Sequence, residues 1–183
     1  MEEMFDVYDK EGRWLGVRPK SFCHSKNPGV YHKPVWIWIV NSKNEVLVQK
    51  RALTKKHMPG KWDAPSAGHV EAGEDFLSAC ERETREELGV IVPRSKFVFQ
   101  KEILSEKVWE LGQVYLLVLD IDIKDCILQT EEVAELCWLS FAQFKDLLYS
   151  ECFVPYDKSY KDWVCEMLQE NFRNKQTNVR KVL

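Results

Sequence analysis

The sequence predicts an α/β sandwich in which helices cover a mixed sheet. Short segments rich in β-branched and aromatic residues surround a central segment of helical periodicity, and further helical segments follow near the end. The chain has 183 residues, with no internal repeat and no low-complexity linker. We therefore expect one domain over residues 1–183, with a core over about 30–150, an added N-terminal strand hairpin and an added C-terminal helix.

The first part of the chain is rich in predicted strands. Residues 3–9 are expected to form a strand that ends at a turn over residues 10–13. Residues 31–40 are aromatic and β-branched, which is typical of a largely buried strand. A turn over residues 41–44 returns the chain into a strand over residues 45–50, so the last two strands are expected to form a hairpin.

A loop over residues 52–62 follows the predicted hairpin. Pro59 and Gly60 interrupt any regular structure there, and a short extended segment then leads to His69. The loop is basic, so some of its cations are candidates to contact substrate phosphates. These cations are Arg51, Lys55, Lys56 and Lys61.

The helix over residues 75–88 has the clearest signals. Phe76, Cys80 and Thr84 are spaced for its core side. Gly89 is expected to end the helix, because glycine accepts the left-handed backbone of a C-terminal cap.

The remaining chain is predicted to add strands and two closing helices. Strands are expected over residues 97–104, 108–120 and 137–139, and helices over 141–149 and 158–172. The locally basic run over residues 173–181 is expected to be a solvated tail.

Charge and composition limit the class of protein. A net charge of −3 does not suggest a nucleic-acid or membrane-surface partner. The acidic N-terminus has no apolar segment of a signal peptide, and no window has the length of a membrane helix. The six cysteines are scattered without metal-ligand spacing. We therefore expect reduced thiols and a cytoplasmic protein.

Three glutamates form an unusual cluster on the predicted helix. Glu83, Glu86 and Glu87 are spaced i, i+3 and i+4, which places their carboxylates on one face, where they repel one another. The last two lie near the helix C-terminus, where the macrodipole also disfavours anions. Taken alone, the three glutamates favour an exposed acidic face. A cluster that breaks local rules can also indicate a ligand, and oxygen donors suit Mg²⁺ or Mn²⁺.

The residues around the cluster favour the cation. Fixed spacings separate Gly68, Glu74, Arg82, Glu83, Glu86, Glu87 and Gly89. This pattern resembles the signature of the Nudix hydrolase family, and the wider resemblance covers about residues 30–150. Thr84 departs from the family, which usually has Ile, Leu or Val there. The resemblance implies a Nudix-type α/β/α sandwich and Mg²⁺-dependent, or Mn²⁺-dependent, hydrolysis of a small organic diphosphate.

The resemblance also implies roles for individual residues. The expected metal ligands are Glu83, Glu86, Glu87 and the backbone carbonyl of Ala67. One of the three glutamates is the expected base, and Arg82 completes the catalytic set by fixing their rotamers. Glu74 is expected to pair with Arg82, and Gly68 and Gly89 to permit close turns of the backbone.

Residues outside the signature complete the expected site. Glu110, Glu131 and Glu132 are alternative bases, and Glu110 and Glu132 are also candidates for further metal ligands. The expected substrate-binding residues are Arg51, Lys61 and His69. Trp36, Trp38 and Trp62 can each stack on a base, although core packing is favoured for the two on the strand.

Several segments resemble the isopentenyl-diphosphate isomerase-like branch of the family. These are residues 5–9, 47–56 and 59–62. His69 stands where the isomerases have a metal-ligating histidine, and His24 and His32 are placed to match further isomerase ligands. A lone histidine is more often structural, and this alternative applies to all four histidines, including His57 and His69, with the active-site role equally favoured for His69 because it lies inside the signature.

Two positions favour hydrolysis over isomerisation. Moving a double bond requires an acid and a base, which the isomerases supply with a cysteine and a glutamate. The corresponding residues here are Ala67 and Gly112, and neither can carry a proton. Two alternatives nevertheless stay open: an isopentenyl-diphosphate isomerase, and a non-catalytic ligand-binding module.

The substrate is left open at this stage. Nucleoside di- or triphosphates, nucleotide sugars, dinucleotides, and isoprenoid or thiamine diphosphates all fit the signature. Because family members are often dimers, a homodimer is a further expectation, although no residue identifies an interface.

Overall fold

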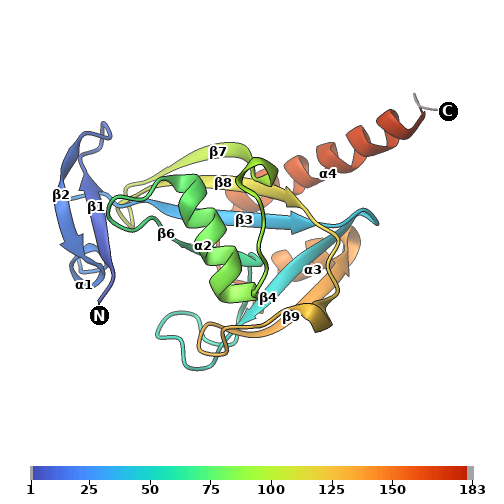
Figure 1. Cartoon of the computed structure of the whole chain (residues 1–183), viewed down its shortest axis with the longest axis horizontal. Coiled ribbons are helices and arrows are strands. Elements are labelled where there is room, and N and C mark those ends of the chain that lie inside the picture. The colour runs from blue at the N-terminus through green and yellow to red at the C-terminus, as the bar shows by residue number, and fades with distance from the viewer. Residues whose placement is uncertain (1, 181–183) are drawn as a thin grey trace.

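The computed structural model describes residues 2–180, which form two sheets (Figure 1). The smaller sheet pairs β1 (Met4–Tyr8) with β2 (Trp14–Pro19), and α1 (Lys20–Cys23) follows it. The larger sheet has seven strands in the order β5-β4-β3-β8-β7, with β6 paired to β3 and β9 paired to β4. Its strands are β3 (Pro34–Val40), β4 (Glu45–Arg51), β5 (Trp62–Asp63), β6 (Ser66–His69), β7 (Val98–Ser105), β8 (Glu110–Val118) and β9 (Val133–Ser140).

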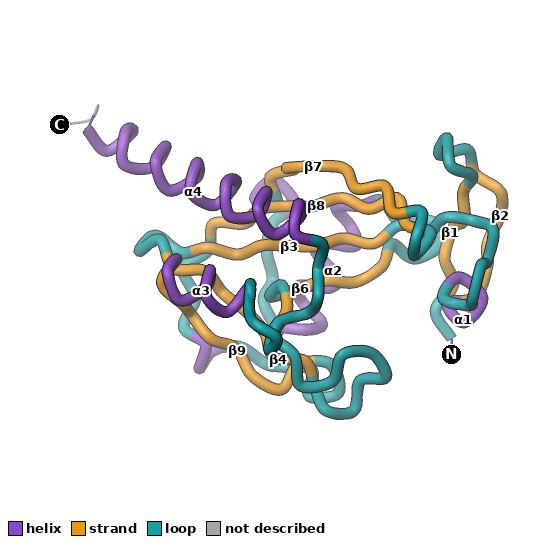
Figure 2. The backbone as a smooth tube through the Cα atoms, turned by 180° about the vertical axis from the view of Figure 1, so that it is seen from behind, coloured by secondary structure: helices purple, strands orange, loops and turns teal. Residues whose placement is uncertain are grey.

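The larger sheet is mixed, as the sequence predicts. β3 runs parallel to β8, whereas the β3–β6, β4–β9 and β7–β8 pairs are antiparallel. Helix α2 (Phe76–Leu88) covers one face of this sheet, and α3 (Phe141–Leu148) and α4 (Lys158–Arg180) lie on the opposite face (Figures 1 and 2). Short 3-10 turns occur at Arg94–Lys96 and Ile123–Asp125. The predicted α/β sandwich is confirmed.

Each face of the sheet has its own core. The core under α3 and α4 includes Trp38, Phe144, Leu148, Val164 and Leu168. The core under α2 includes Ile37, Ala79, Cys80, Leu88 and Leu117. Burying one such large apolar side chain contributes about 1.5–3 kcal/mol, so alternate residues of β3 are held on both faces. The start of β3, at Pro34, pairs with β6, and β6 carries the candidate site described below.

Three predicted elements differ in the structure. The expected hairpin of residues 31–40 and 45–50 is reduced to one registered pair, Val40 with Val46, and the partner of β4 along its length is β9. β9 begins at Val133, before the predicted strand over 137–139. The basic run expected as a tail instead continues α4 through Arg180, and residue 181 lies outside the described part of the chain.

Helix α2 begins and ends where the sequence predicts. The Asp75 carboxylate accepts a hydrogen bond from the Ser78 backbone N–H at 2.8 Å, which caps the first turn. Gly89 has φ 69°, the left-handed conformation of a C-terminal cap. Because both ends are fixed, the helix holds its glutamates at a defined height against the sheet.

Thr84 supports a prediction about stability. Its side chain is fully buried, and its Oγ1 has no hydrogen-bond partner among the described residues. An unsatisfied buried hydroxyl costs about 1–3 kcal/mol, so we expect Thr84→Val to raise the free energy of unfolding by about 1 kcal/mol. Urea denaturation measures the change.

Thr54 provides the matched control for this prediction. Its hydroxyl donates to the Glu131 carbonyl at 2.9 Å, so Thr54→Val removes a hydrogen bond and should not stabilise the fold. An unchanged or lower stability of Thr84→Val would contradict our account of the buried hydroxyl.

The smaller sheet docks against one end of the larger sheet (Figure 1). Tyr8 and Tyr31 exchange two backbone hydrogen bonds of 2.8 Å, and the Gly73 N–H donates to the Asp6 carboxylate at 2.8 Å. The Lys33 ammonium lies 3.6 Å from the centre of the Tyr8 ring. These contacts bring α1 close to β6. Among residues 2–180, no helix has the length and apolar character needed to cross a membrane.

Candidate active site

The site is built along the open edge of β6. One edge of β6 pairs with β3, and α2 lies beside the other. The Ala67 N–H donates to Glu87 Oε2 at 3.1 Å, and the His69 N–H donates to Glu83 Oε1 at 3.2 Å. Two of the three clustered glutamates are therefore held against the free edge of a strand. The third, Glu86, is more exposed, with 45% of its side chain accessible.

The backbone carbonyl of Ala67 faces the same edge. In an extended strand, the N–H and C=O groups of one residue point to the same side. Because the Ala67 N–H points at Glu87, the Ala67 carbonyl also points away from β3 and toward α2. The structure thus brings together the expected carbonyl and carboxylate oxygens. Whether they bind a cation stays a prediction.

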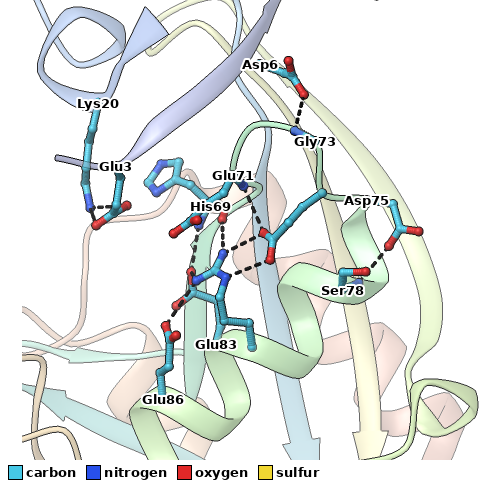
Figure 3. A network of polar contacts seen from close by, with 12 residues as sticks. Glu3, Asp6, Lys20, His69, Glu71, Gly73, Asp75, Ser78, Glu83 and Glu86 are labelled. Atoms are coloured by element: carbon cyan, nitrogen blue, oxygen red, sulfur yellow. Dashed lines mark hydrogen bonds and ion pairs between the residues drawn. The ribbon is translucent and has the colours of Figure 1, made fainter. Parts of the chain in front are cut away.

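Arg82 fixes the cluster through hydrogen bonds to Glu83, Glu86 and the His69 carbonyl, and Figure 3 labels these three partners. Its guanidinium forms two 2.9 Å bonds to the Glu74 carboxylate, which is the expected pair. It also donates to Glu83 at 2.8 Å, to Glu86 at 3.2 Å and to the His69 carbonyl at 2.7 Å. Burial opposes its charge, but the Glu74 and Glu83 carboxylates raise the pKa of Arg82 above its usual value. Arg82 therefore locks α2 to the strand edge.

Gly68 permits the close approach of helix and strand. A Cβ at this position would lie 1.9 Å from Glu83 Oε1 and 2.0 Å from its Cδ. No side chain fits in that space, so only glycine allows the Glu83 carboxylate to lie against β6. The carboxylate occupies the position that a side chain would otherwise fill.

The electrostatics of the cluster suit a divalent cation. Burial, and then the charge of Glu83, raise the pKa of Glu87 from 4.5 to about 8. Burial also raises the pKa of Glu83, against the opposing effect of Arg82. Glu83 and Glu87 are buried carboxylates that lie close together, and their oxygens are hard donors. A Mg²⁺ or Mn²⁺ ion can neutralise their combined negative charge. The residues present fit the cation that the sequence implies.

The raised pKa of Glu87 predicts a pH-dependent stability. Between pH 4.5 and about 8 the folded state binds more protons than the unfolded state, so stability falls as the pH rises. At about 1.4 kcal/mol per pKa unit, we expect a loss of roughly 3–5 kcal/mol across this window in the presence of a chelator. Mg²⁺ should restore most of it at pH 8, because the cation takes the place of the proton.

Denaturation curves at pH 5.5, 7 and 8, with EDTA or with Mg²⁺, measure this effect. Glu87→Gln provides the control, because it removes the titrating group and should flatten the profile in EDTA. A wild-type profile in EDTA that is already flat would mean that Glu87 is not held in the environment described.

A second cluster lies beside the first and consists of histidines. His24, His32 and His69 have ring nitrogens within 4.8 Å of one another. The Nε2 atoms of His24 and His69 are 3.2 Å apart, and His32 Nε2 lies 3.7 Å from a Glu110 carboxylate oxygen. Phe5 stacks on the His69 ring with 4.9 Å between centroids. The structure therefore assembles three histidines that are far apart in the sequence.

The histidine cluster is partly buried, and burial lowers the pKa of all three imidazoles. His32 is 1% exposed, and neither of its ring nitrogens has a hydrogen-bond partner in the described chain. Burial, and then the charge of His24, lower the pKa of His32 to about 4. Burial raises the pKa of Glu110 to about 7. Neutral imidazoles beside a carboxylate can hold a divalent transition metal, and the ring nitrogens of His32 are unpaired in the described chain.

His69 belongs to both clusters. Its backbone N–H and carbonyl contact Glu83 and Arg82, whereas its ring lies among the histidines. The two clusters consequently lie on the two sides of one short strand. Our prediction of His69 as a substrate-binding residue is untested, but its position in the site is clear.

Two residues predicted to bind substrate have other partners. Arg51 donates to the buried Asp63 carboxylate at 2.9 Å and to the His57 carbonyl at 3.2 and 3.1 Å. Lys61 donates to the Glu151 carbonyl. Both residues stabilise the loop over residues 52–62, and the structure does not bring Lys61 to the glutamates. A role of Arg51 toward substrate stays a prediction.

Two other cations reach the site. Lys55 pairs with Glu132, and its charge acts on the pKa of both Glu87 and His69. Lys20, on α1, also lowers the pKa of His69. Lys55 belongs to the basic loop that the sequence singles out. Lys20 was missed, since nothing in its local sequence indicates that α1 docks beside β6.

Comparisons with known proteins agree with this fold and site. A NUDIX domain model matches residues 30–162. Nudix hydrolase 3 of Arabidopsis thaliana is 36% identical over 170 residues, which are 85% of this chain and only 22% of that relative. Isopentenyl-diphosphate Delta-isomerase 2 of Photorhabdus laumondii is 29% identical over 151 residues, or 81% of this chain and 83% of that protein.

A solved structure shows the same fold. The DR0079 protein of Deinococcus radiodurans has a TM-score of 0.69 at 18% identity, covering 92% of this chain and 98% of that chain. This likeness shows that the two proteins share the α/β fold. The chain belongs to the NUDIX family, and it is a Nudix hydrolase.

Proposed function

We propose that the chain hydrolyses the diphosphate linkage of a small organic diphosphate with the help of Mg²⁺ or Mn²⁺. The observation that carries this proposal is the placement of Glu83, Glu87 and the Ala67 carbonyl along one strand edge. The two buried carboxylates repel each other, and a divalent cation that binds their oxygens removes this repulsion. The net charge of −3 favours a small substrate over a nucleic acid.

The proposed reaction assigns tasks to the residues of the site. Glu83, Glu86, Glu87 and the Ala67 carbonyl would hold the cation, which when bound neutralises the diphosphate oxygens and makes water a better nucleophile. One of the three glutamates accepts the proton of the attacking water. Arg82 keeps Glu83 in place, and the positive charge of Lys55 acts on Glu87. Glu110 and Glu132 stay candidates for further ligands.

An isomerase of isopentenyl diphosphate is the second candidate. The histidine cluster beside Glu110 and the likeness to a Delta-isomerase favour it. The two residues that would move protons are absent, and the space at Gly112 is filled. A Cβ there would lie 2.4 Å from Trp36 Cζ3 and 3.0 Å from Pro34 Cγ, so the expected glutamate has no room. We therefore favour hydrolysis.

A screen of diphosphate compounds tests the proposal. The purified protein is incubated with nucleoside diphosphates, nucleotide sugars, dinucleotides and isopentenyl diphosphate, with Mg²⁺, Mn²⁺ or EDTA. We expect cation-dependent release of phosphate-containing products from at least one class. Double-bond migration in isopentenyl diphosphate without hydrolysis of any compound would establish the second candidate instead. Light scattering measures whether the protein is the expected homodimer.

A further inference from the structure

A hollow of about 320 Å³ lies where α3 ends and α4 begins. These two helices cover the face of the larger sheet opposite α2, which carries the glutamates (Figure 2). The hollow is lined by the segment that joins the two helices, by Lys161 of α4 and by Lys61 of the loop over residues 52–62. Its volume is at the lower end of the range of about 300–1,000 Å³ that small-molecule sites have. It therefore has room for a small ligand outside the candidate active site.

The segment between the helices is fixed against β5. Trp62 forms a parallel bridge with Phe153, and two backbone hydrogen bonds of 2.8 and 2.9 Å join Trp62 to the residues on either side of Phe153. Lys61 precedes Trp62, and its ammonium donates to the Glu151 carbonyl. One wall of the hollow is therefore preformed, and Lys61 is held beside it.

Lys161 is an unusually buried lysine. Only 9% of the residue is exposed, and its ammonium lies 5.8 Å from the centre of the Tyr149 ring. In the part of the chain that the structure describes, this ammonium has neither a carboxylate partner nor a hydrogen bond. The neighbouring Asp162 carboxylate instead accepts from the Tyr149 hydroxyl and pairs with Lys158 at 2.5 Å. Because buried charges are normally paired, an unpaired ammonium facing a hollow indicates an anionic ligand.

Apolar groups form the walls beside this ammonium. Phe153 is 1% exposed and lies at the base of the hollow, whereas the Tyr149 ring and Pro155 remain accessible at its sides. Glu151 is the acidic residue of the lining, so the two lysines leave a positive balance of charge. The hollow thus combines positive charge with an accessible apolar surface.

We propose that this hollow binds a small organic anion. One carboxylate or phosphate group of the ligand contacts the ammonium groups of Lys161 and Lys61, and an apolar body packs on Tyr149 and Pro155. Lysine binds either anionic group, because its ammonium acts as a point charge without the fixed geometry of a guanidinium. The proposal does not depend on diphosphate hydrolysis, since the hollow and the glutamates lie on opposite faces of the sheet.

Titration of the whole chain with phenyl phosphate and with benzoate tests the proposal. NMR measures the affinities in EDTA, so that no cation at the glutamates binds the probes. We expect at least one of the two anions to bind with a dissociation constant of about 1 mM or lower. Lys161→Met keeps a stem of similar length but removes the charge, so it should raise this constant at least about 10-fold. Lys161→Arg keeps the charge and should retain most of the affinity.

Two controls separate a built site from general attraction. Benzyl alcohol has the same ring without a charge and should bind at least about 10-fold more weakly than the anion. Lys96→Met removes an equal charge from the exposed turn after α2 and should leave the affinity within about twofold, because solvent screens a distant charge.

A second lysine keeps the test decisive if Lys161→Met fails to fold. Lys61→Met should weaken binding of the same anion, because Lys61 is the other cation of the hollow. No measurable binding of either anion would overturn the proposal. Equal affinity of the wild-type protein and both lysine variants would also overturn it, as would tighter binding of benzyl alcohol than of the anions.

Discussion

Replacing Glu87 with glutamine is expected to lower kcat by about 10²–10³-fold with little change in the fold. Glu87 is 5% exposed and contacts the Ala67 N–H, so the variant keeps the shape and this hydrogen bond but removes a charged oxygen donor. Loss of one group that stabilises charge in the transition state typically has an effect of this size. Steady-state kinetics with saturating Mg²⁺ measure the change, and calorimetry measures the loss of cation affinity.

The fold of this variant can be checked independently. Because a buried glutamate resists ionisation, Glu87→Gln should be at least as stable as wild type at pH 8 in EDTA. Glu81→Gln makes the same chemical change on the same helix outside the cluster and should keep wild-type activity. Wild-type turnover by Glu87→Gln would show that the metal and catalytic assignment is wrong. Glu86→Gln is expected to reduce kcat as well.

Replacing Gly68 with alanine is expected to abolish most activity by a steric route. The added methyl would overlap the Glu83 carboxylate, at 1.9 Å from Oε1, and would push it off the edge of β6. The Arg82 hydrogen bonds to Glu83 and the His69 carbonyl would be disturbed with it. We expect kcat/KM to fall at least about 100-fold, and the free energy of unfolding to fall by about 1–3 kcal/mol.

Gly73→Ala separates this steric effect from general loss of glycine. Gly73 has φ 82°, and a Cβ there would meet no atom within 4 Å. The control should therefore lose about 1 kcal/mol of stability from backbone strain and keep its activity. A crystal structure or cation titration of Gly68→Ala would show whether Glu83 has moved. Unchanged activity would mean that the position of Glu83 against β6 is not needed.

Local signals allowed the central helix to be predicted closely. Asp75 and Gly89 fix the two ends of α2, and each bonds to a residue three or four positions away in the chain. Such short-range interactions can be predicted directly from the sequence. The pairing of β4 could not be read in this way. Its partner β9 is distant along the chain, and the turn at Asn41–Asn44 favoured a hairpin that the sheet largely replaces. Strand pairing depends on how distant segments pack.

The two clusters of the site differ in the same respect. The glutamates lie within one helical turn or so of each other, so their spacing alone indicates a shared face. The histidines come from the residue after α1, from the chain before β3 and from β6. Only the docking of the smaller sheet brings Lys20 and His24 near His69. The pattern of apolar residues along the chain does not indicate how the two sheets dock. The resemblance suggested His24 and His32, but not their closeness to Phe5.

The smaller sheet has a consequence for where this enzyme begins. The match to the family starts at residue 30, yet Phe5, Lys20 and His24 come before it. A shortened chain starting at residue 30 would retain every glutamate of the signature and both cores, but would lose one of the three imidazoles and the ring stacked on His69. The match to the family model and the set of residues that form the histidine cluster therefore have different boundaries. In this protein, a segment before the start of the family match supplies part of the surroundings of His69.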